Sequence, residues 1–179
     1  TLNGKDGFRI AGAAPGDMNG YGVRAAGDVN GDGFDDVIVG SVSSAPNGVQ
    51  SFAAYVVFGK AAGFAANLNL SALNGNDGFR IAGGAAGDMA GYAVGGIGDF
   101  NGDGYDDVIV GAPGAGGARS GSSYVVFGKA EGFSATLDLG TIGGADGFRV
   151  SGVAAGDDSG YAVSGAGDVN GDGFDDLMV

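Results

Sequence analysis

Three short acidic loops carry the residues with the clearest chemistry in this chain. The sequence GDVNGDGFDD at 27–36 recurs as GDFNGDGYDD at 98–107 and as GDVNGDGFDD at 167–176. Twelve of the 21 acidic residues lie in these loops, and each loop runs directly into an apolar stretch such as VIV. Like charges this close together repel one another, so their concentration indicates a bound cation.

The spacing within each loop supplies five oxygen donors. When Asp28 is position 1, side-chain oxygens stand at positions 1, 3, 5 and 9, and a backbone carbonyl stands at position 7. Gly33 at position 6 permits the sharp turn that aims these donors at one point. The predicted ligands are Asp28, Asn30, Asp32, Phe34 and Asp36 in the first loop, Asp99, Asn101, Asp103, Tyr105 and Asp107 in the second, and Asp168, Asn170, Asp172, Phe174 and Asp176 in the third. The remaining acids at position 8, which are Asp35, Asp106 and Asp175, are expected to point away from the ion.

These donors favour calcium over other metals. Each loop offers three carboxylates, one amide and one carbonyl, all hard oxygens, which disfavours Zn²⁺ and Cu²⁺. Mg²⁺ prefers to keep several waters, so we expect three Ca²⁺ sites. The competing interpretation is a solvated turn, because Asp, Asn and Gly dominate turns. Three copies in register disfavour it. An EF-hand requires Glu at position 12, where this chain has Val39, Val110 and Val179.

The loops belong to a longer repeat. DGFRI at 6–10 recurs at 77–81 and as DGFRV at 146–150, and YVVFGK at 55–60 recurs at 124–129. Each unit contains four short runs rich in Val, Ile, Tyr and Phe, separated by Gly, Asn and Asp, which predicts β-strands joined by turns. The runs VIV and YVVF lack polar alternation, so we expect strands buried on both faces, as in a propeller blade.

Several motifs resemble those of a known family. FGK at 58–60 and 127–129, GAP at 111–113, and the acidic loop between them resemble the FG-GAP repeat. That repeat builds the calcium-binding propeller of integrin alpha subunits and of many bacterial extracellular proteins. The first unit departs from it, with GSVSSAP at 40–46 in place of GAP, so its connecting loop is expected to differ.

The predicted fold class is therefore all-β. We expect residues 1–179 to form one partial β-propeller of four-stranded antiparallel blades, with about two and a half FG-GAP repeats at 4–74, 75–143 and an incomplete 144–179. An open arc of blades leaves strand edges unpaired. We therefore expect a segment of a longer chain, or several copies that complete a ring or filament together.

Composition excludes several function classes. The chain has 8 basic residues against 21 acidic ones, for a net charge of −13, which disfavours nucleic acid as a partner. Histidine and cysteine are absent, which removes the commonest general base and the thiol nucleophile of enzymes. There is no run of about 20 apolar residues, so membrane insertion is not expected.

These observations predict a non-enzymatic calcium-binding module at an extracellular or cell-surface location. The resemblance implies adhesion or partner recognition, with a protein or glycan ligand on the face opposite the calcium loops. That face would carry 41–52, 112–123 and the turns at Asp17, Asp88 and Asp157. The alternative is a structural surface-layer or filament component whose blades stack on other copies of the chain. A third possibility is the accessory propeller of a secreted hydrolase.

Overall fold

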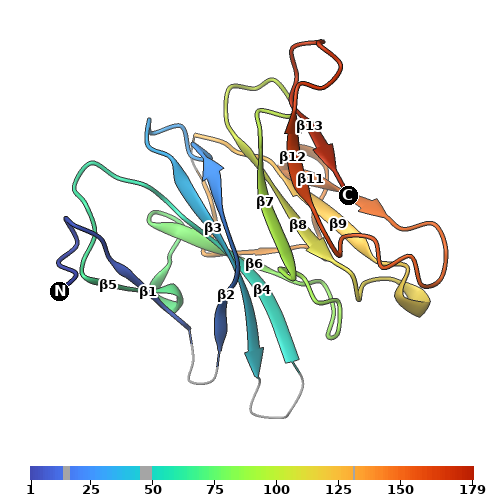
Figure 1. Cartoon of the computed structure of the whole chain (residues 1–179), viewed down its shortest axis with the longest axis horizontal. Helices are drawn as coiled ribbons and strands as arrows, with labels where there is room; N and C mark the ends of the chain where they lie inside the picture. Colours follow the sequence, from blue (N-terminus) through green and yellow to red (C-terminus); the bar gives the residue numbers. More distant parts are fainter. Residues whose placement is uncertain (14–16, 45–49, 131) are drawn as a thin grey trace.

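The computed structural model describes residues 1–13, 17–44, 50–130 and 132–179. These residues form an arc of β-sheets that fan outward beside one another from the N-terminal to the C-terminal end of the chain (Figure 1). Within these ranges there is no α-helix, and the helical turns are three short 3₁₀ segments: η1 (Leu70–Ala72), η2 (Gly117–Arg119) and η3 (Gly144–Asp146). No helix in the described part of the chain has the length and hydropathy of a membrane span.

The first sheet is a complete blade with one added strand. Its antiparallel order runs from β2 (Met18–Gly27) through β3 (Asp36–Ser44) and β4 (Gln50–Val57) to β6 (Gly78–Ala82). The short strand β10 (Thr136–Asp138) then pairs parallel to β6 at the outer edge. Its parallel direction follows from the connection, because the chain crosses the second blade before it returns.

The second sheet repeats the same four-stranded antiparallel order, with β7 (Ala93–Gly98), β8 (Asp107–Ala112), β9 (Ser122–Val126) and β11 (Gly147–Ser151). The third contains the antiparallel pair β12 (Ser164–Gly167) and β13 (Asp176–Met178). This arrangement confirms the all-β class and the partial propeller of antiparallel blades. The strand that follows each acidic loop also confirms the choice against an EF-hand, whose loop is flanked by helices.

The sheets begin one strand later than the sequence repeat. The DGFR segment of the second repeat forms β6, which pairs with β4 of the first repeat, and β11 pairs with β9 in the same way. At the N-terminus, β1 (Arg9–Ala11) pairs parallel with β5 (Asn67–Asn69) and not with β2. Each blade therefore takes its outer strand from the next repeat, which ties consecutive repeats together.

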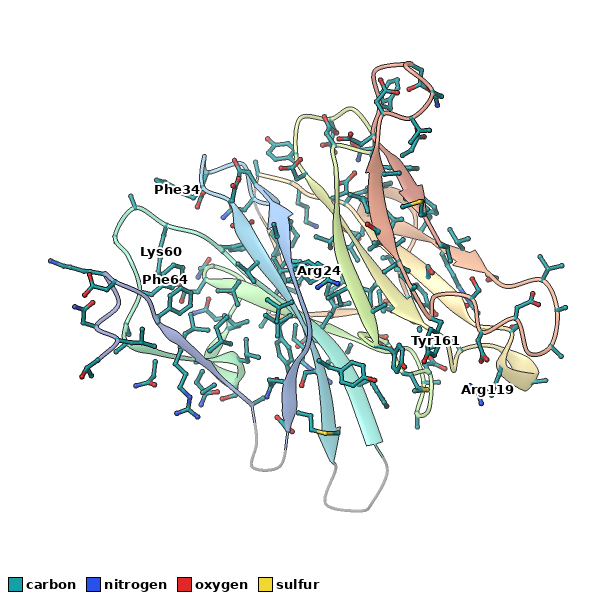
Figure 2. All side chains as sticks on the ribbon, viewed as in Figure 1. Arg24, Phe34, Lys60, Phe64, Arg119 and Tyr161 are labelled. Atoms are coloured by element: carbon teal, nitrogen blue, oxygen red, sulfur yellow. The ribbon has the colours of Figure 1, made fainter. Side chains whose placement is uncertain are left out.

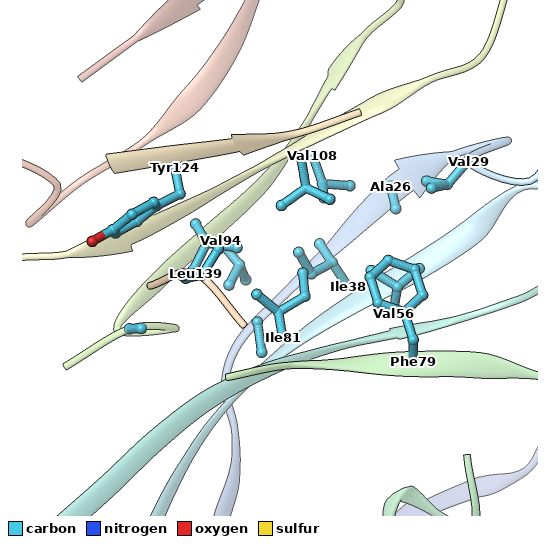
Figure 3. Packing of buried hydrophobic residues seen from close by; sticks show 14 of the residues in the cluster. Ala26, Val29, Ile38, Val56, Phe79, Ile81, Val94, Val108, Tyr124 and Leu139 are labelled. Atoms are coloured by element: carbon cyan, nitrogen blue, oxygen red, sulfur yellow. The ribbon is translucent and has the colours of Figure 1, made fainter. Parts of the chain in front are cut away.

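The main core lies between the first two blades (Figure 3). Alternate residues of each strand face opposite sides of the sheet, so Ile38 and Val56 of the first blade join Val108 and Val126 of the second in one fully buried cluster. A further cluster around Ile109 joins the second blade to the third. Every residue of β8 and β9 is buried, which confirms the two-sided burial expected from their apolar runs.

Candidate metal centre

The three acidic loops occupy equivalent positions in the three blades. Each connects the innermost strand to the second strand: β2 to β3, β7 to β8 and β12 to β13. All three lie at the same edge of the arc, the upper edge in Figure 1, and Phe34 marks the first loop in Figure 2. The propeller therefore gathers all fifteen predicted donors at one face.

The carboxylate at position 1 closes each loop. In the first loop its two oxygens accept hydrogen bonds from the backbone N–H groups of Asp32 at 3.0 Å and Gly33 at 2.8 Å. The same pair of bonds joins Asp103 and Gly104 to Asp99, and Asp172 and Gly173 to Asp168. Gly33 has φ +86°, a left-handed conformation that glycine adopts without strain, so the turn requires this residue type.

Positions 3 and 5 turn toward the same loop backbone. Asn30 Oδ1 accepts a hydrogen bond from Asp32 N–H at 3.1 Å, and Asp32 Oδ1 accepts one from Phe34 N–H at 3.0 Å. The second and third loops repeat these bonds through Asn101 and Asp103 and through Asn170 and Asp172. Three side chains at alternate positions therefore lie against the tight turn, as the spacing predicted.

The carboxylates at position 9 of the first two loops are buried at the start of the second strand. Asp36 is 1% exposed and accepts hydrogen bonds from Val29 N–H at 3.0 Å and Gly59 N–H at 2.8 Å. Asp107 is 0% exposed and accepts them from Phe100 at 3.1 Å and Gly128 at 2.8 Å. Burial raises the pKa of each carboxyl from 3.8 to about 6. The nearby charges of Asp28 and Asp32 also raise the pKa of Asp36, and the charge of Asp103 also raises the pKa of Asp107.

The donors to Asp36 and Asp107 include residues that sequence reasoning missed. Gly59 and Gly128 are the glycines of the two FGK motifs. Their recurrence beside the buried strand YVVF was the available signal, but only the paired strands show that the motif ends opposite a buried carboxylate.

The chemistry of the donors fits calcium, although the described residues contain no preassembled cluster of three or more acidic side chains around a point. The carboxylates instead accept hydrogen bonds from backbone amides, most of them in their own loops. Each carboxylate oxygen has two lone pairs, so an oxygen that accepts an N–H retains one for a cation. Asp28, Asn30, Asp32, Asp36 and the carbonyl of Phe34 are the residues that would hold an ion in the first loop, with their counterparts in the other two.

The opposite ends of the inner strands carry a row of tyrosines. Tyr21 lies near the start of β2, and Tyr92 and Tyr161 precede β7 and β12. The ring centroid of Tyr92 lies 5.2 Å from that of Tyr21 and 4.9 Å from that of Tyr161. Side-chain hydrogen bonding with Tyr161 and with Tyr21 favours the neutral form of the Tyr92 hydroxyl and so raises its pKa. The sequence signal for this row is the GY dipeptide, which recurs at 20–21, 91–92 and 160–161.

Asp88 and Asp157 lie in two of the turns expected on the recognition face. Asp88 accepts a hydrogen bond from Ala85 N–H at 2.8 Å, and Asp157 accepts bonds from Val153 N–H at 2.9 Å and Ala154 N–H at 2.7 Å. Both carboxylates therefore close their own turns. Part of the predicted loop 41–52 lies outside the described residues.

Comparison with known proteins agrees with this geometry. Residues 90–126 match the FG-GAP repeat family. Integrin alpha-PS5 of Drosophila melanogaster is 30% identical over 168 residues, which cover 92% of this chain and 15% of the relative. The chain is an integrin alpha-like FG-GAP repeat protein. The resemblance predicted from its motifs is thus confirmed.

Two further integrin alpha relatives match over a shorter region. Integrin alpha pat-2 of Caenorhabditis elegans and that of Caenorhabditis briggsae are each 38% identical over 93 residues, or 50% of this chain and 7% of the relative. The chain therefore spans a small fraction of the length of the integrin alpha subunits that it matches. The FG-GAP match at 90–126 extends from just before β7 to the end of β9, and so contains the whole second acidic loop.

Proposed function

We propose that this chain is a non-enzymatic, calcium-binding propeller module that acts outside the cell or at its surface in adhesion or partner recognition. The observation that carries the proposal is the threefold repetition of one donor set at one edge of the propeller. Each set follows an inner strand and ends on a carboxylate at the next strand. The similarity to integrin alpha subunits supports the extracellular location and the adhesive role.

Calcium has a structural role in this proposal. Each loop brings carboxylates close together between two strands, and an ion would offset their repulsion. Calcium sites of extracellular modules have dissociation constants of about 10⁻⁴–10⁻³ M. At ten times such a constant, each site adds about 1.4 kcal/mol to the free energy of unfolding. Cytosolic calcium is too low to fill such sites, which supports the proposed extracellular location.

The row of tyrosines supports the proposed recognition face. Tyr21 and Tyr161 are 53% and 59% exposed. Tyr161 lies at the opposite end of the blades from the calcium loops, the first of which is marked by Phe34 (Figure 2). Tyrosine combines a large apolar ring with a hydroxyl, so it is enriched in binding surfaces. Rings that already pack against one another lose little side-chain freedom on binding. A protein or glycan that presents an apolar surface with hydrogen-bonding groups fits this row.

A second candidate is the structural component assembled from stacked blades. Apolar side chains are exposed on the first and third blades: Val23 on β2, and Met178 and Val179 at the end of β13. Exposed apolar surface of this kind marks interaction sites. Size measurement in calcium and in EDTA separates the two roles, because large ordered assemblies that form only in calcium favour the structural one.

Calorimetric titration of the EDTA-treated chain tests calcium binding. We expect three sites, and Asp32→Asn should remove one because it replaces a carboxylate ligand with an amide. Asp35→Asn is the matched control, since it removes the same charge at position 8 of the same loop and should keep three sites. Absence of calcium uptake below about 10 mM, well above the range of extracellular modules, would overturn the proposal.

A further inference from the structure

The first two acidic loops each contact the loop of the next blade, and the first such contact is a pair of hydrogen bonds. Asp106, at position 8 of the second loop, accepts a hydrogen bond through Oδ2 from Asp28 N–H at 2.7 Å. The backbone N–H of Asp106 also donates to the carbonyl of Asp28 at 3.2 Å. Asp28 is the first predicted ligand of the first loop. Asp106, expected from its position to be uninvolved, thus holds the backbone of a ligand in the neighbouring blade.

The second blade fixes the first loop at two more points. Lys129 N–H, just after β9, donates to the carbonyl of Val29 at 3.0 Å. The ring of Tyr105 lies directly on Gly31, where a Cβ atom would overlap the ring. Residues of the following blade therefore hold the first loop at three places, which are Asp28, Val29 and Gly31.

The same arrangement recurs between the second and third blades but ends there. Asp175 lies against Gly98 as Asp106 lies against Gly27, and the ring of Phe174 lies on Gly102 as that of Tyr105 lies on Gly31. In the third loop, no atom of the described residues lies within 4 Å of a Cβ placed on the equivalent glycines, Gly167 and Gly171.

We propose that the aromatic–aspartate pair at positions 7 and 8 of each loop positions the calcium ligands of the preceding blade. Tyr105 and Asp106 serve the first site, Phe174 and Asp175 serve the second, and the third loop presents an open surface that fits the same pair from a further FG-GAP blade. The inference rests on the proposed calcium function. It makes the affinity of each site depend on the blade that follows it.

Two consequences follow. In the chain as it stands, the third site should bind calcium more weakly than the first two, although its donor set is the same. Removal of the Asp106 carboxylate should weaken the first site, which lies in another blade. A hydrogen bond to a charged acceptor has the strength to change affinity by about tenfold.

The experiment is a calcium titration of the ¹⁵N-labelled chain followed by NMR, with the amides of Gly33, Gly104 and Gly173 as reporters of the three sites. Asp106→Ala should lower the affinity of the first site about tenfold and change the second by less than about threefold. Asp106→Asn keeps an oxygen acceptor for Asp28 N–H, so it should restore part of that loss.

Asp35→Ala is the matched control. It removes a carboxylate at position 8 of the first loop, and no hydrogen bond to Asp35 is formed by any residue that the structure describes. If Asp106 acts only through its charge, Asp35→Ala should weaken the first site as much as Asp106→Ala does. Equal effects of the two variants, or a third site as tight as the first in the unmodified chain, would overturn the inference while calcium binding itself stands. Absence of calcium shifts at all three reporters would instead overturn the proposed function.

Discussion

Replacement of Asp107 by asparagine should stabilise the calcium-free protein at pH 7. Asp107 is fully buried, and burial raises its pKa from 3.8 to about 6. A pKa higher in the folded state than in the unfolded state means that stability is greatest below pH 3.8 and is lost as pH rises through 6. Two pKa units correspond to about 3 kcal/mol, which is the destabilisation from the ionised carboxylate at pH 7.

Asparagine removes that charge but keeps part of the hydrogen bonding. Its Oδ1 accepts the N–H of Gly128, as the carboxylate does at 2.8 Å, while its Nδ2 has no lone pair for the N–H of Phe100. The lost bond costs about 1 kcal/mol. The free energy of unfolding in EDTA at pH 7 should therefore rise by about 2 kcal/mol. At pH 4, where the native carboxyl is already protonated, the variant should have no advantage.

The assay is urea unfolding followed by far-UV circular dichroism, in EDTA at pH 7 and pH 4. Asp35→Asn, an exposed change in the neighbouring blade's loop, is the control and should alter stability by less than about 0.5 kcal/mol. In calcium, the Asp107 variant should gain less stability than the native chain, because it has lost one predicted ligand. The reasoning fails if the variant is destabilised to the same extent at both pH values.

Three other perturbations follow from the same contacts. Gly31→Val should lower the free energy of unfolding by about 3 kcal/mol, because the left-handed backbone at φ +71° is strained for valine and the side chain would overlap Tyr105. Gly171 has φ +76° and open space around it, so Gly171→Val should lower the free energy of unfolding by only about 1–2 kcal/mol. Equal losses for the two variants in urea unfolding would contradict this explanation. Phe79→Ala should lower the free energy of unfolding by about 3–5 kcal/mol in the same assay, because the Phe79 side chain is 0% exposed and its ring centroid lies 4.5 Å from that of Phe133. A loss below about 1 kcal/mol would show that the core between the blades is not packed as described. Calcium affinity measured by calorimetry should fall as the pH is lowered from 7 to 5. The buried carboxyls of Asp36 and Asp107, each with a pKa of about 6, must lose their protons to bind the ion. An affinity independent of pH in this range would argue against their role as ligands.

The strands and loops were accessible to sequence reasoning because local chemistry determines them. Runs such as VIV and YVVF identify buried strands through their composition, and Gly33 identifies a tight turn through its conformational freedom. The repetition of these signals along the chain predicts the propeller. The residues of each predicted site belong to one of three loops at equivalent positions in the blades.

The pairing of strands is harder to predict from the sequence than their positions. The apolar pattern of DGFR identifies a strand but contains no information on which blade it joins, so the placement of β6 and β11 in the blade before their own repeat appeared only in the fold. The same holds for the burial of Asp36. Its position in the loop predicted a ligand, while its hydrogen bond from Gly59 depends on the register of two distant segments.

The role of Asp106 shows why spacing along one loop is insufficient. Counting from position 1 directs its side chain away from its own ion, and the structure places that side chain against the loop of the preceding blade. Asp106 thus has no predicted role within its own repeat, and its contact with Asp28 forms only because the two repeats pack side by side. The repeated tyrosines also form a row only in the folded chain, where the ring centroids of neighbouring tyrosines lie 4.9 and 5.2 Å apart.

The most direct test of calcium binding is a crystal structure of the chain grown in calcium, with diffraction data collected at a wavelength where calcium scatters anomalously. We expect an anomalous peak in each of the three acidic loops, surrounded by the oxygens at positions 1, 3, 5, 7 and 9. Loops without peaks, in which the aspartates still bond only the amides of their own turns, would contradict the central claim.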